Sequence, residues 1–247
     1  MPRQRSTRKR LDQAMIERGL VDSLEMARTL IMVGKVMVDG ESAVSASKSI
    51  SLEGAIALET GPEYYSRGGI KLAHALGHFQ VTTRDVVALD VGASTGGFTH
   101  CLLQREARRV YALDVGYGQL DYRLRQERRV VVMERINARY PYVLDEIVDL
   151  ATVDVSFISL IRVLSSTAAH VKDGGFIIAL VKPQFEARRN EVGKGGVVRD
   201  PRVHARVLGR VIAWVVNNGF RLKGLVPSPI TGEQGNREFF ILVSTFH

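Results

Sequence analysis

Four ionisable residues from distant parts of the chain are the main candidates for chemistry. They are Lys71, Asp154, Lys182 and Glu238. Two ammonium and two carboxylate groups in one crevice would suit the deprotonation of a weakly acidic hydroxyl, with a lysine acting as base or stabilising the developing alkoxide. Taken singly, Lys71 or Glu238 is better explained as half of a surface ion pair. The hypothesis therefore depends on a fold that brings all four together.

The elements that would position these residues are apolar, mostly β-branched runs that alternate with helical stretches such as residues 204–216. The predicted strands are residues 86–90, 110–114, 130–133, 150–154, 176–181, 221–227 and 239–246. This alternation predicts an α/β fold with a Rossmann-like, mostly parallel sheet of seven strands that is covered on both faces. Ligands lie outside the carboxyl ends of such strands, where Asp154 and Lys182 stand. An antiparallel last strand would begin with Glu238 at the same edge, and a helix opened by residues 66–69 would carry Lys71 there.

A glycine-rich loop follows the first strand of this series and is the candidate cofactor site. The predicted contacts are Asp90, Gly92, Ala93, Ser94, Gly96, Gly97 and Phe98, with Asp114, Asp154 and either Asn137 or Glu134 after later strands. Glycine lets the backbone approach a ligand, and Asp114 can accept hydrogen bonds from both ribose hydroxyls of an adenosine. The loop alone leaves a dinucleotide and S-adenosylmethionine open. S-adenosylmethionine is favoured, because Ser94 replaces a glycine that a pyrophosphate needs and Asp90 would hold an ammonium group.

Composition limits the partners that the chain could have. The net charge of +8 indicates an anionic partner, and it comes from beyond residue 64, because residues 1–64 hold nine basic and nine acidic residues. Cys101 is the only cysteine, which excludes an internal disulfide framework and a cysteine-based zinc site and favours a reducing cytoplasm. The scattered histidines predict no metal site. No apolar run approaches the ~20 residues that span a bilayer, so no membrane segment is predicted.

The first sixty residues predict a separate small α+β unit, with two short helices followed by a small sheet. Ser23 can cap the second helix, and Asp39-Gly40 is a strong hairpin-turn signal. This unit resembles the small RNA-binding module first known from ribosomal protein S-four. The residues that carry the resemblance are 10–12, 19–20, 23, 27, 30–31, 34 and 36–40. A folded appendage without RNA contact is the alternative, because Leu24 stands where that family usually has a basic residue. The resemblance implies RNA contacts by Arg8, Lys9, Arg28 and Lys35.

The boundaries follow from this pattern. We predict an RNA-binding module at residues 1–59, a linker at residues 60–64 and an α/β domain at residues 65–247. The linker prediction depends on the break Thr60-Gly61-Pro62-Glu63, which is typical of a short connection.

Five motifs of the larger domain are specific. They are Tyr65–Leu72, Asp90–Phe98, Asp154–Leu160, Leu180–Glu186 and Gly232 with Gly235–Phe239. With them the chain resembles the TlyA family of ribosomal RNA methyltransferases, long named hemolysins, whose catalytic domain is similar to FtsJ-type ribose methyltransferases. The resemblance implies S-adenosylmethionine-dependent 2′-O-methylation of cytidine in the RNA of the small ribosomal subunit, the large one or both, in the cytoplasm. It also implies that the four ionisable residues form a catalytic tetrad, for which no metal is required.

A basic, glycine-rich segment at residues 186–201 follows Lys182 and is predicted to clamp RNA phosphates, with a flexible connector as the alternative. Together with Arg67, its candidate contacts are Arg188, Arg189, Lys194 and Arg199. Three other functions stay open. They are a membrane-active hemolysin, which would need a membrane segment that the sequence lacks, a non-catalytic ribosome-assembly or RNA-binding factor, and a nicotinamide oxidoreductase.

Overall fold

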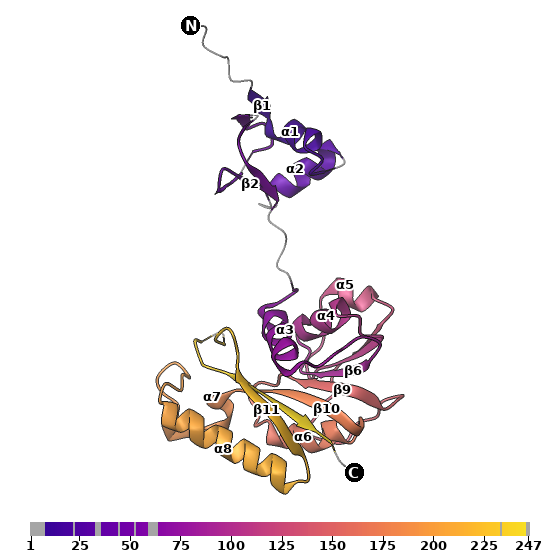
Figure 1. The fold of residues 1–247 in the computed structure, drawn as a ribbon, viewed down its shortest axis with the longest axis vertical. Helices are drawn as coiled ribbons and strands as arrows, with labels where there is room; N and C mark the ends of the chain where they lie inside the picture. The colour runs from indigo at the N-terminus through magenta and orange to yellow at the C-terminus, as the bar shows by residue number, and fades with distance from the viewer. Residues whose placement is uncertain are drawn as a thin grey trace. The chain divides into compact units, whose positions relative to one another are not determined.

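The chain divides into two compact units, Met1–Glu63 and Tyr64–His247 (Figure 1). The computed structural model describes residues 8–21, 23–32, 36–43, 45–51, 53–58, 64–232 and 234–245. Each unit has a hydrophobic core of its own, so each is described by itself.

The first unit has two helices and short strands around a small core. The helices are α1 (Leu11–Glu17) and α2 (Leu24–Met32), and the strands are β1 (Arg8–Arg10), β2 (Val36–Val38), β3 (Glu41–Ser42), β4 (Ser49–Ser51) and β5 (Ile56–Leu58). As predicted, the Ser23 hydroxyl accepts a hydrogen bond from the Met26 amide at 3.1 Å and caps α2. Asp39 and Gly40, both at positive φ, form the predicted tight turn between β2 and β3.

The second unit is built on a seven-stranded sheet. Its strands are β6 (Val87–Val91), β7 (Arg109–Leu113), β8 (Val130–Met133), β9 (Val148–Val153), β10 (Val171–Val181), β11 (Arg221–Pro227) and β12 (Phe239–Ser244). They lie in the order β11-β12-β10-β9-β6-β7-β8. β12 is antiparallel to both of its neighbours, whereas the other pairs are parallel. The predicted Rossmann-like sheet with an antiparallel last strand is therefore confirmed.

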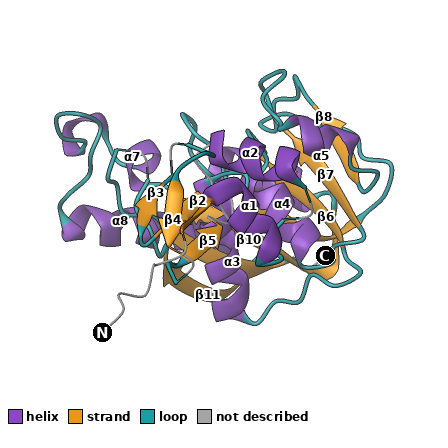
Figure 2. Ribbon diagram, turned by 90° about the horizontal axis from the view of Figure 1, so that it is seen from above, coloured by secondary structure: helices purple, strands orange, loops and turns teal. Residues whose placement is uncertain are grey.

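Helices cover both faces of this sheet (Figures 1 and 2). One face carries α3 (Arg67–Phe79), α4 (Gly97–Gln104) and α5 (Tyr122–Gln126), and the other carries α6 (Ile161–Ala168) and α8 (Pro201–Asn217). The short helices α7 (Pro183–Glu186) and η1 (Arg189–Glu191) follow β10. Because both faces are buried, the central strands are continuous apolar runs, which is why the sequence predicted them well.

Strand β10 differs most from its prediction, because it begins at Val171 rather than at Phe176. Its pairing with β9 shifts register between these two residues, where Gly174 has φ +69°. Lys172 and Asp173 interrupt the apolar pattern, so this first part could not be predicted from the sequence. β12 ends at Ser244, and Phe246, the predicted end, lies outside the described residues.

Candidate active site

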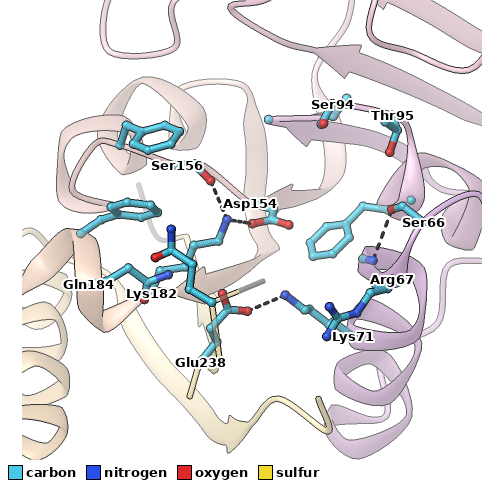
Figure 3. Close-up of a pocket in the computed structure, with 18 of the residues that line it drawn as sticks. Ser66, Arg67, Lys71, Ser94, Thr95, Asp154, Ser156, Lys182, Gln184 and Glu238 are labelled. Atoms are coloured by element: carbon cyan, nitrogen blue, oxygen red, sulfur yellow. Dashed lines mark hydrogen bonds and ion pairs between the residues drawn. The ribbon is translucent and has the colours of Figure 1, made fainter. Parts of the chain in front are cut away.

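A cavity of about 810 Å³ opens where the parallel strands end. Its walls are the start of α3, the loops after β6 and β9, the residues that follow β10 and the segment before β12. Figure 3 shows that the four predicted catalytic side chains face this cavity, and each of them lines it. A cavity of this size can hold a small-molecule ligand.

Lys182 and Asp154 form the first charged pair in the cavity. The Lys182 Nζ lies 2.6 Å from a carboxylate oxygen of Asp154 and donates a hydrogen bond to the Ser156 hydroxyl at 2.9 Å. The pair forms because β9 and β10 are neighbouring parallel strands whose carboxyl ends lie at the same edge. The two side chains are 12% and 20% exposed, so the ammonium is held in place but can still reach a ligand.

Lys71 and Glu238 form the second pair, although 167 residues separate them. The Lys71 Nζ lies 2.5 Å from Glu238 Oε2, and the side chains are only 10% and 3% exposed. Lys71 lies in the first turns of α3, which Ser66 caps by accepting a hydrogen bond from the Gly68 amide. A side chain at Gly232 would lie 2.5 Å from a Glu238 oxygen, so only glycine fits beside this carboxylate.

The glycine-rich loop forms the opposite wall of the cavity. Gly92, at φ +86°, is required here, because a Cβ would lie 2.4 Å from the Asp154 carbonyl oxygen. The cavity is lined by Gly92, Ala93, Ser94, Gly97 and Phe98. Gly96, at φ +94°, lies behind the loop, where a side chain would meet Leu124.

One protein family matches the second unit, and individual proteins match nearly the whole chain. Residues 64–245 match the family described as FtsJ-like methyltransferase. The Mycobacterium tuberculosis (strain H37Rv) 16S/23S rRNA (cytidine-2′-O)-methyltransferase TlyA is 43% identical, over 96% of this chain and 90% of its own length. The chain belongs to the TlyA group of FtsJ-like methyltransferases. This membership confirms the predicted family and the prediction of a methyltransferase.

Two further relatives agree with this membership. The Bacillus subtilis protein YqxC is 46% identical, over 96% of this chain and 85% of its own length. A solved structure from Streptococcus thermophilus, of a protein that carries the name hemolysin, is 40% identical with a TM-score of 0.73 and covers 98% of this chain and 90% of that one. The similarity thus extends beyond the sheet and includes the first unit.

Asp114 of this methyltransferase lies beside the glycine-rich loop but does not line the cavity. Its carboxylate accepts hydrogen bonds from the backbone amides of Ser94 at 2.8 Å and Gly116 at 2.7 Å. A carboxylate has about four lone-pair sites, so it can still accept hydrogen bonds from ribose hydroxyls. The ribose contact of Asp114 stays a prediction that its free lone pairs allow.

The structure does not bring Asp90 to the cavity. This residue is fully buried, and its two oxygens accept hydrogen bonds from the hydroxyls of Thr99 at 2.7 Å and Thr152 at 3.0 Å. Burial raises the pKa of Asp90 to about 7. Asp90 thus connects β6 to α4 and β9 beneath the loop, where it supports the cavity wall instead of facing a ligand.

The two candidates for the adenine contact are also outside the cavity. Asn137 is exposed and its side chain accepts a hydrogen bond from the Arg139 amide at 3.0 Å, which closes a turn. Glu134 is paired with Arg125 and accepts a hydrogen bond from the Gly118 amide at 2.9 Å. The predicted adenine contact stays a prediction, for which the Asn137 NH₂ group and the second Glu134 oxygen are available.

The predicted RNA contacts are spread over both units. Arg67 lines the cavity and donates to the Thr231 carbonyl at 2.7 Å, while Arg188, Arg189 and Lys194 are exposed on the segment after α7. In the first unit, Arg8 donates to the Ser49 carbonyl, Lys9 pairs with Glu17 and Arg28 pairs with Asp12. Lys35 lies outside the described residues.

The sequence did not predict several side chains that line the cavity, of which Phe157 is the most unusual. It is 91% exposed, has φ +63° and lies with its ring centroid 5.1 Å from that of Phe185. Ser156 and Gln184 were also missed, because an isolated serine or glutamine carries no pattern. Their only signal was their position directly after strands that end in candidate residues.

The described residues form neither a metal-binding cluster nor a membrane-spanning helix. In the described part of the chain, no group of three or more histidine, cysteine, aspartate or glutamate side chains is arranged to hold a metal ion. Among the same residues, no helix is both long enough and apolar enough to cross a bilayer.

Proposed function

We propose that this protein transfers a methyl group from S-adenosylmethionine to the 2′-hydroxyl of a cytidine in ribosomal RNA. The observation that supports this most directly is the cavity in which two lysine–carboxylate pairs lie opposite the glycine-rich loop. The relative from Mycobacterium tuberculosis carries this reaction in its name, for 16S and 23S RNA. The RNA of both ribosomal subunits is therefore the substrate to test.

The residues on the loop side fit S-adenosylmethionine. Ala93 and Ser94 offer a narrow wall without large side chains, and Gly92 keeps the backbone close to the cavity. Asp114 is placed beside Ser94 to accept hydrogen bonds from a ribose. When bound, the cofactor supplies a methyl group that its sulfonium sulfur has already activated, so positioning of the substrate oxygen contributes much of the rate.

The lysine–carboxylate pairs act on the substrate hydroxyl. As its oxygen forms a bond to the methyl carbon and the carbon–sulfur bond breaks, the hydroxyl loses its proton to water in the open cavity. The Lys182 ammonium, held by Asp154 and Ser156, stabilises the negative charge that develops on the oxygen. Lys71, held by Glu238, provides a second donor from the opposite side and fixes the ribose for in-line attack.

Aromatic side chains at the cavity would hold the base of the target nucleotide. Phe157 exposes nearly its whole ring next to Ser156, and Phe185 lies beside it. Stacking of an unpaired base on an aromatic ring is worth about 1–3 kcal/mol and does not depend on the base. The base would therefore be held by stacking while the ribose faces Lys182.

We assign the remaining contacts to both units of the chain. Residues 1–59 would bind RNA as an S-four-like module, residues 60–64 would link it, and residues 65–247 would catalyse the transfer. Because Lys9 and Arg28 are paired with Glu17 and Asp12, an RNA phosphate would have to compete with these carboxylates. With ribosomal subunits as substrate, the protein would act in the cytoplasm.

Transfer of a tritiated methyl group from S-adenosylmethionine to purified small and large ribosomal subunits tests this function. We expect labelled RNA with the native chain and a loss of about 10²–10⁴ in kcat for Lys182→Ala, with unchanged affinity for S-adenosylhomocysteine in calorimetry. Lys223→Ala is the matched control, since Lys223 is an exposed lysine on β11 that does not line the cavity. No transfer by the native chain to either subunit, or full activity of Lys182→Ala, would refute the proposal.

A further inference from the structure

A second cavity, of about 360 Å³, lies next to the catalytic one. Gln234 lines both cavities, so the two are separated by little more than one side chain. The walls of the second cavity come from the segment before α8, the first turn of α8 and the segment before β12. Glu238, in the last of these segments, lines the catalytic cavity, so the two sites share one structural support.

Buried hydrogen bonds hold the walls of this second cavity together. Asn236 is only 1% exposed, and its side-chain amide donates to the Gly196 carbonyl and accepts from the Val198 amide, both at 2.9 Å. His204, which is 7% exposed, holds the Val198 carbonyl through Nε2 at 2.9 Å. The segment before α8 is thus attached both to the helix and to the segment before β12, which makes the cavity a preformed site.

The second cavity carries positive charge from two arginines. Arg199 and Arg237 line it and are exposed, and neither makes an ion pair or a side-chain hydrogen bond within the described residues. No carboxylate is among the described residues that line it. The nearby Asp200 is already engaged as the cap of α8, where it accepts a hydrogen bond from the Arg202 amide at 2.8 Å.

The catalytic cavity offers fewer free cations. Its two lysines are each paired with a carboxylate at 2.6 Å or less, so these four groups leave little net charge for a phosphate, and Arg67 is the remaining basic residue of the described lining. An RNA strand whose ribose enters that cavity carries a phosphate on each side of the ribose. If Arg67 meets one of these phosphates, the other still lacks a cation in the catalytic cavity, and the adjacent pair of arginines is placed to supply it.

We propose that the second cavity binds a backbone phosphate of the RNA substrate, next to the nucleotide that is methylated. Arginine suits this role because its planar guanidinium can donate two parallel hydrogen bonds to phosphate oxygens. This inference rests on the proposed function and adds that the substrate is recognised as a strand, not as an isolated nucleoside. Arg199 and Arg237 would thereby determine affinity for RNA without taking part in methyl transfer.

The test compares the native chain with the double variant Arg199→Ala/Arg237→Ala in the methylation of ribosomal subunits at several salt concentrations. We expect KM for the subunits to rise about tenfold or more, and the slope of log affinity against log salt to become shallower by about 1 for one lost phosphate contact. At saturating RNA, kcat should stay within about twofold, as should the affinity for S-adenosylhomocysteine. Arg199→Lys/Arg237→Lys should give an intermediate KM, because it keeps the charge but loses the planar fork.

Arg84→Ala controls for the loss of positive charge as such, since Arg84 is exposed and paired with Glu106 at 2.6 Å away from both cavities. It should leave KM and the salt slope unchanged. If the double variant keeps the native KM and salt slope, or if Arg84→Ala changes them equally, the phosphate site is refuted. If instead the native chain methylates no ribosomal RNA, the proposed function itself has failed.

Discussion

The buried pair of Lys71 and Glu238 gives a quantitative prediction that separates stability from catalysis. Replacing Lys71 by methionine removes the ammonium but keeps the length of the side chain, and it leaves the Glu238 carboxylate buried, with 3% exposure, without its partner at 2.5 Å. Removing one member of a buried ion pair costs about 3–5 kcal/mol, whereas replacing both members is often close to neutral. We therefore expect Lys71→Met alone to destabilise the protein by about 3 kcal/mol and Lys71→Met/Glu238→Gln by about 1 kcal/mol or less.

Thermal unfolding followed by circular dichroism measures this difference. For a domain of 150–250 residues, 1 kcal/mol shifts Tm by about 2–4 °C, so the single variant should melt about 6–12 °C below the native chain. The double variant should recover most of this loss and still lack activity, because both members of the pair are gone. Urea unfolding of the native chain, both single variants and the double variant then gives the coupling energy.

The pair of Lys182 and Asp154 is the internal control. Its side chains are 12% and 20% exposed, so solvent compensates part of the charge that a single substitution leaves behind. Lys182→Met should therefore lower Tm less than Lys71→Met, while both abolish methyl transfer. Equal melting temperatures for Lys71→Met and the native chain, or a coupling energy near zero, would show that Lys71 and Glu238 do not depend on each other.

Four further predictions concern single side chains. Because burial raises the pKa of Asp90 from 3.8 to about 7, the folded state keeps a proton that the unfolded state has lost between these pH values. The free energy of unfolding should therefore fall as pH rises from about 4 to about 7. In urea unfolding, Asp90→Asn should lack this pH dependence, and an unchanged dependence would show that it does not come from Asp90. Asp114→Ala should weaken binding of S-adenosylhomocysteine about tenfold or more in calorimetry, and unchanged affinity would mean that the ribose lies elsewhere. Phe157→Ala should raise KM for ribosomal subunits by about tenfold through lost stacking, with donor affinity retained as the check on folding. Glu186 accepts hydrogen bonds from the Ser159 hydroxyl at 2.6 Å and the Leu160 amide at 2.5 Å. Glu186→Ala should therefore lower kcat about tenfold or more by loosening the loop that carries Asp154, whereas Glu186→Gln should keep most of the native kcat. Equal rates for the two variants would refute this positioning role.

Most of the sheet could be predicted because its strands show the patterns typical of their positions. The central strands are continuous apolar runs, as expected for strands buried on both faces. The two edge strands, β8 and β11, were predicted to the residue, because β8 is an unbroken apolar run and β11 alternates between exposed and more buried residues. The first part of β10 could not be predicted, because Lys172, Asp173 and two glycines interrupt that pattern. Pairing with β9 compensates for this interruption, and such pairing acts only in the folded chain.

The candidate site was partly predictable for a similar reason. Asp154 and Lys182 each follow a strand, so their meeting at one edge follows from the parallel sheet. Which carboxylate holds which lysine depends on tertiary structure, because Lys71 and Glu238 meet only through the placement of α3 against the segment before β12. The position of Asp90 was also beyond the sequence, since Thr152, 62 residues away, decides that this carboxylate is buried beneath the loop.

The second cavity itself could not be predicted. Arg199 and Arg237 belong to segments that the chain separates by α8 and β11, and the hydrogen bonds of Asn236 hold these segments together. The sequence predicts a phosphate contact by Arg199 through its basic, glycine-rich segment, but nothing in it pairs Arg199 with Arg237. Their lack of acidic partners within the described residues is a property of the fold.

Nucleoside mass spectrometry of the RNA after reaction tests the central claim most directly. Native protein, S-adenosylmethionine and unmodified ribosomal subunits are incubated, and the RNA is digested to nucleosides and compared with a Lys182→Ala reaction. We predict 2′-O-methylcytidine in the native reaction and none above background with Lys182→Ala. Methylation on a base, methylation that Lys182→Ala performs equally well, or no modified nucleoside at all would contradict a cavity that activates a ribose hydroxyl.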